Sequence, residues 1–228
     1  MGKKDTGKGQ PKPSKPIGSK RKSSRSMFIL IGIGGLLVVG ALLAYRHNTP
    51  KPPPEAVNPD MLPGIQVGDA PWEAETAHLR ERLDLIGLPA LAAEGTGLHS
   101  HQHLDIFIHG HTVLVPAGIG IGPSRSYISP VHTHDGGGVI HVESPVVQTF
   151  TLGQFFDIWG VRLTAQCLGS HCTDAQGTLK VFVNGELAAG DPRNIALARR
   201  QEIVVAYGTE QESPKPIPFE YEGFPPGG

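Results

Sequence analysis

Apolar and polar residues alternate with a period of two from residue 98 to residue 108. This period predicts a strand with two unlike faces, one formed by leucine and isoleucine and the other rich in histidine. The dipeptide His109-Gly110 follows directly and predicts a tight reversal into a second strand at residues 112–115. The segment is therefore expected to form a hairpin with one apolar face.

Further strands are predicted in the second half of the chain. Residues 139–143 alternate in the same way, and residues 203–207 form a short apolar run. Two more runs, at 179–183 and 186–188, flank Asn184-Gly185, which is a strong signal for a two-residue hairpin turn.

Two segments have the features of short helices. Residues 71–86 begin with a proline and carry leucines at helical spacing, and residues 151–160 begin with a threonine cap and end with a glycine. With about six short strands, these elements predict an α+β domain built on a mainly antiparallel sheet, loosely like a β-grasp. A small cupin-like barrel is the alternative architecture.

A membrane anchor is predicted near the N-terminus. Residues 27–45 are 19 residues without a charge, enough for a helix that covers roughly 28 Å, about one hydrocarbon core. Residues 1–26 carry nine Lys or Arg against one acid, so we expect a disordered head on the cytoplasmic side and the rest of the chain outside. A cleaved secretory signal is the alternative, but the apolar run and the basic head are long for one.

The remaining chain is predicted to comprise a proline-rich linker at 46–70, an extracytoplasmic α+β domain at 71–210 and a disordered tail at 211–228. Residues 27–228 contain 11 basic and 20 acidic residues. This acidic balance argues against nucleic acid as a partner. The predicted single-pass anchor makes the membrane the expected partner, and the sequence does not identify a protein partner.

Histidine is the most informative residue for chemistry. Nine of the eleven histidines lie between residues 99 and 171, and several form H-x-H pairs. Two histidines at i and i+2 of a strand share a face and lie roughly 6.5 to 7 Å apart at the backbone, so both rings can converge on one ion. The histidines expected to bind a metal are His101, His103, His132, His134 and His141. The competing interpretation is a solvent-facing sheet surface that is merely rich in histidine.

The expected ligand is one divalent transition metal. All-imidazole ligation suits Cu(II) or Zn(II), and the three methionines lie outside the expected core of the exterior domain. Carboxylates near the histidines would accept hydrogen bonds from the ligand rings; the candidates are Asp105, Asp135 and Glu143. The pair His103 and Asp105 also allows a 2-His-1-carboxylate iron site.

The only cysteines, Cys167 and Cys172, are expected to form a disulfide, because the predicted topology places both in an oxidising compartment. The alternative is a thiol metal site that includes His171.

The phrases SPVHTHDGGGVIHVESP, FTLGQFFDIWG, VFVNGE and QEIVVAYG resemble an uncharacterised family of small membrane-anchored extracytoplasmic His-rich proteins. The resemblance covers roughly residues 98–208 and implies no activity, substrate or ligand. Function is therefore argued from the residues: we expect a metal-binding module for metal handling or sensing. A mononuclear metalloenzyme that uses the same site, and an envelope scaffold or interaction module without metal, are the alternatives.

Overall fold

The structure is a computed structural model of the whole chain. The chain separates into two units, Met1–Pro53 and Pro54–Gly228, and all the helices and strands given below belong to the second unit. The described residues are Gly2, residues 57–214, Glu220 and Tyr221.

Several predicted segments fall outside the described residues. These are the basic head at 1–26, except for Gly2, and the apolar stretch at 27–45. Within the described part of the chain, no helix has the length and apolar character needed to cross a membrane. Of the predicted tail at 211–228, the structure describes residues 211–214, Glu220 and Tyr221. The hydroxyl of Tyr221 donates a hydrogen bond to the carbonyl oxygen of Gln201 (2.9 Å).

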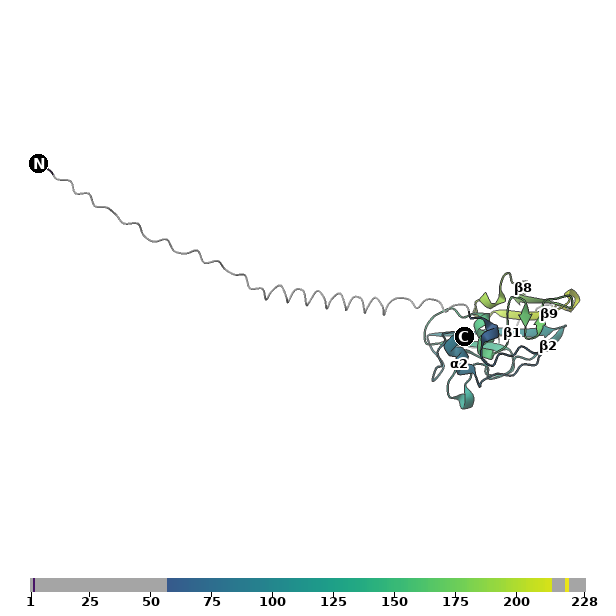
Figure 1. Ribbon diagram of the computed structural model, residues 1–228, viewed down its shortest axis with the longest axis horizontal. Coiled ribbons are helices and arrows are strands. Elements are labelled where there is room, and N and C mark those ends of the chain that lie inside the picture. Colours follow the sequence, from purple (N-terminus) through teal and green to yellow (C-terminus); the bar gives the residue numbers. More distant parts are fainter. Residues whose placement is uncertain (1, 3–56, 215–219, 222–228) are drawn as a thin grey trace. The chain divides into compact units, whose positions relative to one another are not determined.

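The described residues form one seven-stranded sheet, in which the strand order is β3-β4-β1-β9-β7-β8 and β2 pairs with β1 (Figure 1). The pairing of β1 with β9 is parallel, and the other strand pairs of this sheet are antiparallel. The strands are β1 Leu98–Ile108, β2 His111–Val113, β3 Val131–His132, β4 Val139–Ser144, β7 Thr178–Val183, β8 Glu186–Leu187 and β9 Glu202–Gly208.

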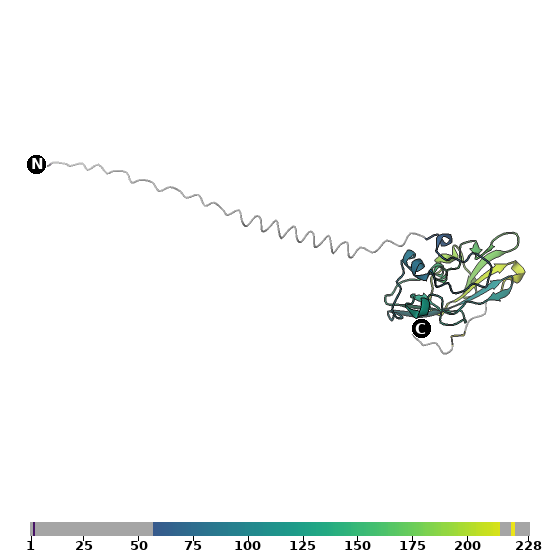
Figure 2. The same cartoon turned by 60° about the horizontal axis from the view of Figure 1, so that its bottom comes forward.

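This architecture confirms the predicted α+β class with a mainly antiparallel sheet. The order of the strands is that of an open sheet over the described residues, so the cupin-like barrel is not the arrangement found. The first and the last long strands, β1 and β9, are parallel neighbours in the middle of the sheet. Figure 2 shows these strands side by side, with helical segments lying beside the sheet.

The two predicted hairpin turns are present. His109 and Gly110 have φ angles of 50° and 77°, and Asn184 and Gly185 have φ angles of 51° and 84°. Two consecutive residues with positive φ make a turn whose twist matches that of the flanking strands, which is why Gly follows His or Asn at these positions. The turns fix the registers of β1 with β2 and of β7 with β8.

Helix α3, Leu152–Trp159, begins and ends where the sequence predicts. The Thr151 hydroxyl accepts a hydrogen bond from the Gln154 amide, the Gln154 side chain accepts one from the Thr151 amide, and Gly160 ends the helix with a φ of 78°. Apolar side chains of α3 join those of β1, β4 and β9 in one core cluster. The apolar face of the sheet is therefore buried against α3, and the histidines of β1, β3 and β4 lie on the other face.

Helix α2, Leu79–Leu85, is shorter than the predicted helix at 71–86. Trp72 is buried against Trp159 instead, with ring centroids 6.1 Å apart, and its Nε1 atom donates to the Gly68 carbonyl oxygen. This packing holds the segment before α2 in a non-helical path, because tertiary contacts outweigh helical propensity.

The guanidinium of Arg82 is fully buried where α2 meets α3. It donates to the Glu75 carboxylate, to the carbonyl oxygen of Glu75, and to the carbonyl oxygens of Pro63 and Ile158 at 3.0 Å each. A buried cation of this kind is tolerated only where hydrogen bonds and a counter-charge replace its water. The ion pair between Arg82 and Glu75 therefore anchors the segment before α2 to the core.

The predicted disulfide between Cys167 and Cys172 is present and closes a small two-stranded hairpin. The remaining short elements are β5 Cys167–Leu168, β6 His171–Cys172 and the 3₁₀ helices η1 Pro59–Met61, η2 Pro123–Arg125, η3 Pro192–Asn194 and η4 Glu210–Glu212.

Candidate metal centre

The polar face of the sheet brings histidines from three adjacent strands together. In the register of β1 with β4, His101 lies opposite His141 and His99 lies opposite Glu143. In the register of β3 with β4, His132 lies opposite the same His141. Directly opposed residues project to the same face, so these side chains share one surface patch.

Within this patch, two pairs of rings converge. The Nε2 atoms of His99 and His101 are 3.2 Å apart, and so are the Nε2 atoms of His132 and His134. Two nitrogens bound to one tetrahedral zinc ion at about 2.0 to 2.1 Å would lie roughly 3.3 to 3.4 Å apart. Without a metal, each pair can share one N–H···N hydrogen bond, and the same geometry is therefore ready for a shared ion.

Glu143 lies between the two pairs. Its Oε1 atom is 3.2 Å from Nε2 of His99 and 3.4 Å from Nδ1 of His141, and its Oε2 atom is 3.9 Å from Nε2 of His132. The side chains of the patch form two groups that could hold a metal ion. Within each group, the ligand atoms lie within 4.8 Å of one another. The two groups are His99, His101, His141 and Glu143, and His132, His134, His141 and Glu143.

The tautomer of His132 suits metal binding. Its Nδ1 atom lies 3.0 Å from the carbonyl oxygen of Ser129 and donates to it, which leaves the lone pair on Nε2 directed at the cluster. A hydrogen bond from the second ring nitrogen to a carbonyl oxygen is the usual support of a metal-binding histidine. Local backbone contacts fix this strand end, since Thr133 accepts from the Ile119 amide and donates to the Pro116 carbonyl oxygen.

Burial keeps the inner rings neutral. Burial, together with nearby His141 and His99, lowers the pKa of His101 to about 4. Burial likewise lowers the pKa of His132, although the Glu143 carboxylate opposes this. Burial alone would raise the pKa of Glu143, but the neighbouring imidazoles of His141, His132 and His99 outweigh it and lower that pKa. At neutral pH His101 and His132 therefore offer neutral nitrogens beside the Glu143 carboxylate, which is the state that metals bind.

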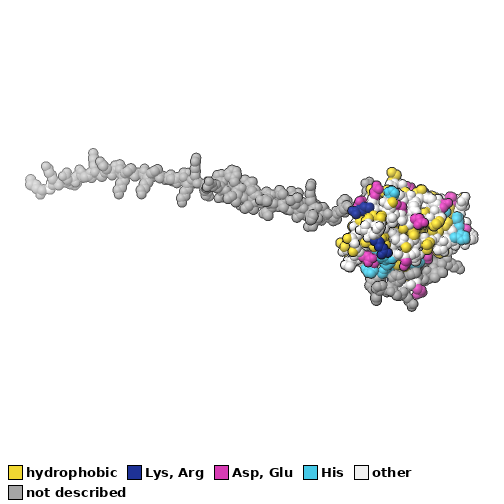
Figure 3. Space-filling model, turned by 90° about the horizontal axis from the view of Figure 1, so that it is seen from below, with side chains coloured by type: hydrophobic (Ala, Val, Ile, Leu, Met, Phe, Trp, Pro, Cys, Tyr) yellow, Lys and Arg dark blue, Asp and Glu magenta, His cyan; other side chains and the backbone are white. Residues whose placement is uncertain are grey.

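The patch is open to solvent at its two ends. His101 is 3% exposed and His132 is fully buried, whereas the side chains of His99 and His134 are 43% and 38% exposed. Figure 3 shows that histidine side chains reach the surface of the folded unit. An ion could therefore enter from the outside and be held on the inner rings.

The structure brings four of the five predicted ligands together and separates the fifth. His101, His132, His134 and His141 belong to the patch, whereas His103 turns toward β9. Nδ1 of His103 lies 3.0 Å from Oε2 of Glu202, and Nε2 lies 2.9 Å from the Gly137 carbonyl oxygen.

His103 therefore belongs to a second group. Its ring is largely buried; burial alone would lower its pKa, but the hydrogen bond and charge of Glu202 outweigh this and raise it. Oδ2 of Asp105 lies 3.9 Å from Nδ1 of His103. His103, Glu202 and Asp105 form a further group that could hold an ion. An imidazolium that donates from both nitrogens satisfies the same contacts without a metal.

We expect His103→Ala to destabilise the metal-free protein by about 2 kcal/mol at pH 6, because it removes a cation from a buried carboxylate. A raised folded-state pKa means that this contribution is present below the unfolded pKa and is lost as pH rises through the folded value, so the loss should be smaller at pH 9. Urea unfolding at both pH values, with chelator present, measures it. The control is His111→Ala at an exposed position, and an equal effect at both pH values would contradict the assignment.

The three carboxylates that were predicted to lie beside the metal ligands are found in three different places. Glu143 lies within the patch as a candidate ligand rather than beside one, and Asp105 belongs to the His103 group. Asp135 is exposed and accepts a hydrogen bond from the Gly137 amide, so it shapes the glycine turn. Whether any of these residues binds a metal stays a prediction.

Two candidate ligands were not predicted from the sequence, His99 and Glu202. His99 continues the period of two that contains His101 and His103, and this signal was sufficient to find it. Glu202 is opposite His103 only because β9 lies parallel to β1, and no local pattern indicates that pairing.

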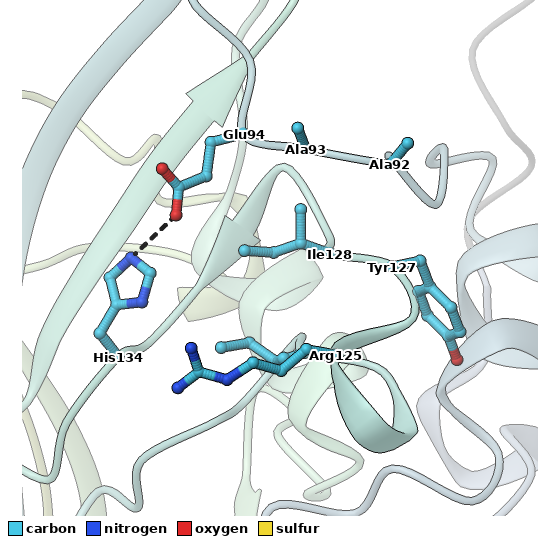
Figure 4. A pocket seen from close by; sticks show the side chains of 8 residues that line it. Ala92, Ala93, Glu94, Arg125, Tyr127, Ile128 and His134 are labelled. Carbon is cyan, nitrogen blue, oxygen red and sulfur yellow. Dashed lines mark ion pairs between the residues drawn. The ribbon is translucent and has the colours of Figure 1, made fainter.

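A cavity of about 260 Å³ adjoins the patch at His134 (Figure 4). Glu94 forms an ion pair with His134 at 3.4 Å across its mouth, and the guanidinium of Arg125 points toward the same end. Tyr127 lines the side away from His134, and Ile128 lies between them. A second cavity of about 370 Å³ also includes Arg125 and His134.

Comparisons of the chain with family models, with curated proteins and with solved structures found no match. The class that fold and site define is therefore an α+β protein whose sheet carries histidine and glutamate clusters that could hold a metal ion.

Proposed function

We propose that this protein binds a divalent transition metal, copper or zinc, through the histidine patch on β1, β3 and β4, and that it serves metal handling or sensing. The observation that carries the proposal is the convergence of two H-x-H pairs on Glu143, with Nε2 atoms 3.2 Å apart in each pair. Burial supports it as well. A solvent-facing surface that is merely rich in histidine would not bury His101 and His132, because burying polar rings costs free energy.

The proposed location is the outer side of a membrane, with residues 27–45 as a single-pass anchor. The uncharged stretch and the basic residues before it support this orientation. The disulfide of the folded unit supports an oxidising compartment. The acidic balance of the chain after residue 26 argues against nucleic acid as a partner.

Metal uptake by the full-length chain tests the proposal. The protein is stripped with chelator, incubated separately with Zn(II) and Cu(II), desalted, and analysed for metal by mass spectrometry. We expect stoichiometric metal in the wild type and in the control His111→Ala, because His111 is exposed and outside the patch. A wild-type protein that retains no metal after desalting would overturn the proposal.

The cavity at His134 favours a metalloenzyme as the second candidate. An open position on an ion held by His134 would face Arg125, which suits an anionic substrate. Metal-dependent turnover of a carboxylate or phosphate ester that is lost in Arg125→Ala, with metal content unchanged, would favour the enzyme over the binding module.

A further inference from the structure

We propose that the histidine patch holds two metal ions, with Glu143 as the ligand that bridges them. This inference rests on the proposed function, since it specifies how many ions the same patch takes.

The patch offers too many ligands, too widely spread, for one ion. Six residues contribute to it, whereas a zinc ion takes four ligands. Over the described residues, the six ligand atoms form two groups of four within 4.8 Å rather than one group of six. Ligands on one ion at about 2.1 Å lie no more than roughly 4.2 Å apart, so one ion cannot use both pairs. Each H-x-H pair therefore defines its own ion position.

Glu143 presents one carboxylate oxygen to each of the two ion positions. Oε1 lies beside His99 and His141, and Oε2 lies on the side of His132. A carboxylate in this orientation can bridge two ions about 3.5 to 4 Å apart, the separation common in two-metal sites. Glu143 is buried between the two positions, so a carboxylate here would offset part of the charge of the two ions.

The two ion positions differ in the number of protein ligands that they offer. His99, His101, His141 and Oε1 of Glu143 give the first ion four protein ligands. Because Oε1 lies 3.4 Å from Nδ1 of His141, we assign this ring to the first ion.

The second ion is then held by His132, His134 and Oε2 of Glu143, and one position is left open. The cavity at His134 adjoins this half of the patch, and the carboxylate of Glu94, 3.4 Å from Nε2 of His134, adds a second negative charge there. A closed ion beside an open one is a geometry that stores one metal firmly and exchanges or uses the other.

Copper loading of the full-length chain tests the inference. The stripped protein is titrated with Cu(II) and desalted; metal is counted by mass spectrometry and spins are counted by electron paramagnetic resonance. We expect about two copper ions per chain, with fewer spins than ions because a bridged pair couples magnetically. Two variants remove one half each: His99→Ala and His134→Ala should each retain about one ion with a full spin, and His111→Ala should behave as the wild type.

The outcomes separate the inference from the function on which it rests. One ion per wild-type chain overturns the two-ion site and leaves metal binding standing, whereas no bound metal overturns both. Two ions with full, uncoupled spins overturn the bridge by Glu143. Because His99 and His134 are partly exposed, both variants are expected to fold, and near-ultraviolet circular dichroism verifies this.

Discussion

Replacing His141 by alanine is expected to weaken metal binding by more than about 100-fold at the position that this ring shares with His99 and His101. Loss of a hydrogen-bonding partner behind a metal ligand already costs roughly 10- to 100-fold in affinity, and the loss of a ring that is itself a ligand, such as His141, should cost more. Its ring lies 4.5 Å from that of His101 and 4.4 Å from that of His134, so no neighbouring ring can take its place without rearrangement.

Isothermal titration of the stripped protein with Zn(II) measures this effect. His111→Ala is the matched control, because it removes an imidazole from an exposed position of a neighbouring strand in the same sheet. Wild-type affinity and stoichiometry in His141→Ala would contradict the placement of the metal in the patch.

The second large effect is expected at Arg82, far from the metal chemistry. We expect Arg82→Ala to lower the free energy of unfolding by about 3 to 5 kcal/mol, because it leaves the Glu75 carboxylate without its cation and removes the donors to three carbonyl oxygens. For a domain of this size, the melting temperature should fall by on the order of 10 °C.

Arg80→Ala provides the control on the same helix. The Arg80 side chain is 61% exposed and pairs with Asp84 at 3.6 Å, an exposed ion pair worth less than about 0.5 kcal/mol. Burial would raise the pKa of Glu75, but the pair with Arg82 outweighs it and lowers that pKa; the contribution of the pair is present above the unfolded pKa and is lost as pH falls through the folded value. Equal stability losses in the two variants would refute the structural role of Arg82.

Local patterns predicted those parts of the fold that local physics decides. Gly110 and Gly185 mark turns because consecutive positive φ angles favour glycine, and Thr151 and Gly160 bound α3 because they satisfy the helix ends. The start of α2 was predicted at residue 71, which is wrong, because the helix begins at Leu79 and the path before it depends on the burial of Trp72 against Trp159, far along the chain.

The site was predicted in outline and not in its ligand set. The period of two placed His101 and His103 on one face of β1, but which of them joins the other histidines depends on the strand on each side. His101 faces β4 and the other histidines, whereas His103 faces Glu202 of β9, which is about a hundred residues away in sequence. Pairings of this range are set by the whole sheet, and no local window contains them.

Anomalous diffraction from crystals of the zinc-loaded protein, recorded above and below the zinc edge, tests metal binding by the patch most directly. We predict anomalous density between β1, β3 and β4, with ring nitrogens of the patch histidines and an oxygen of Glu143 at about 2.0 to 2.2 Å from it. Zinc-loaded crystals that show no anomalous density within reach of His132 and Glu143, or show it only at histidines outside the patch, would contradict the account.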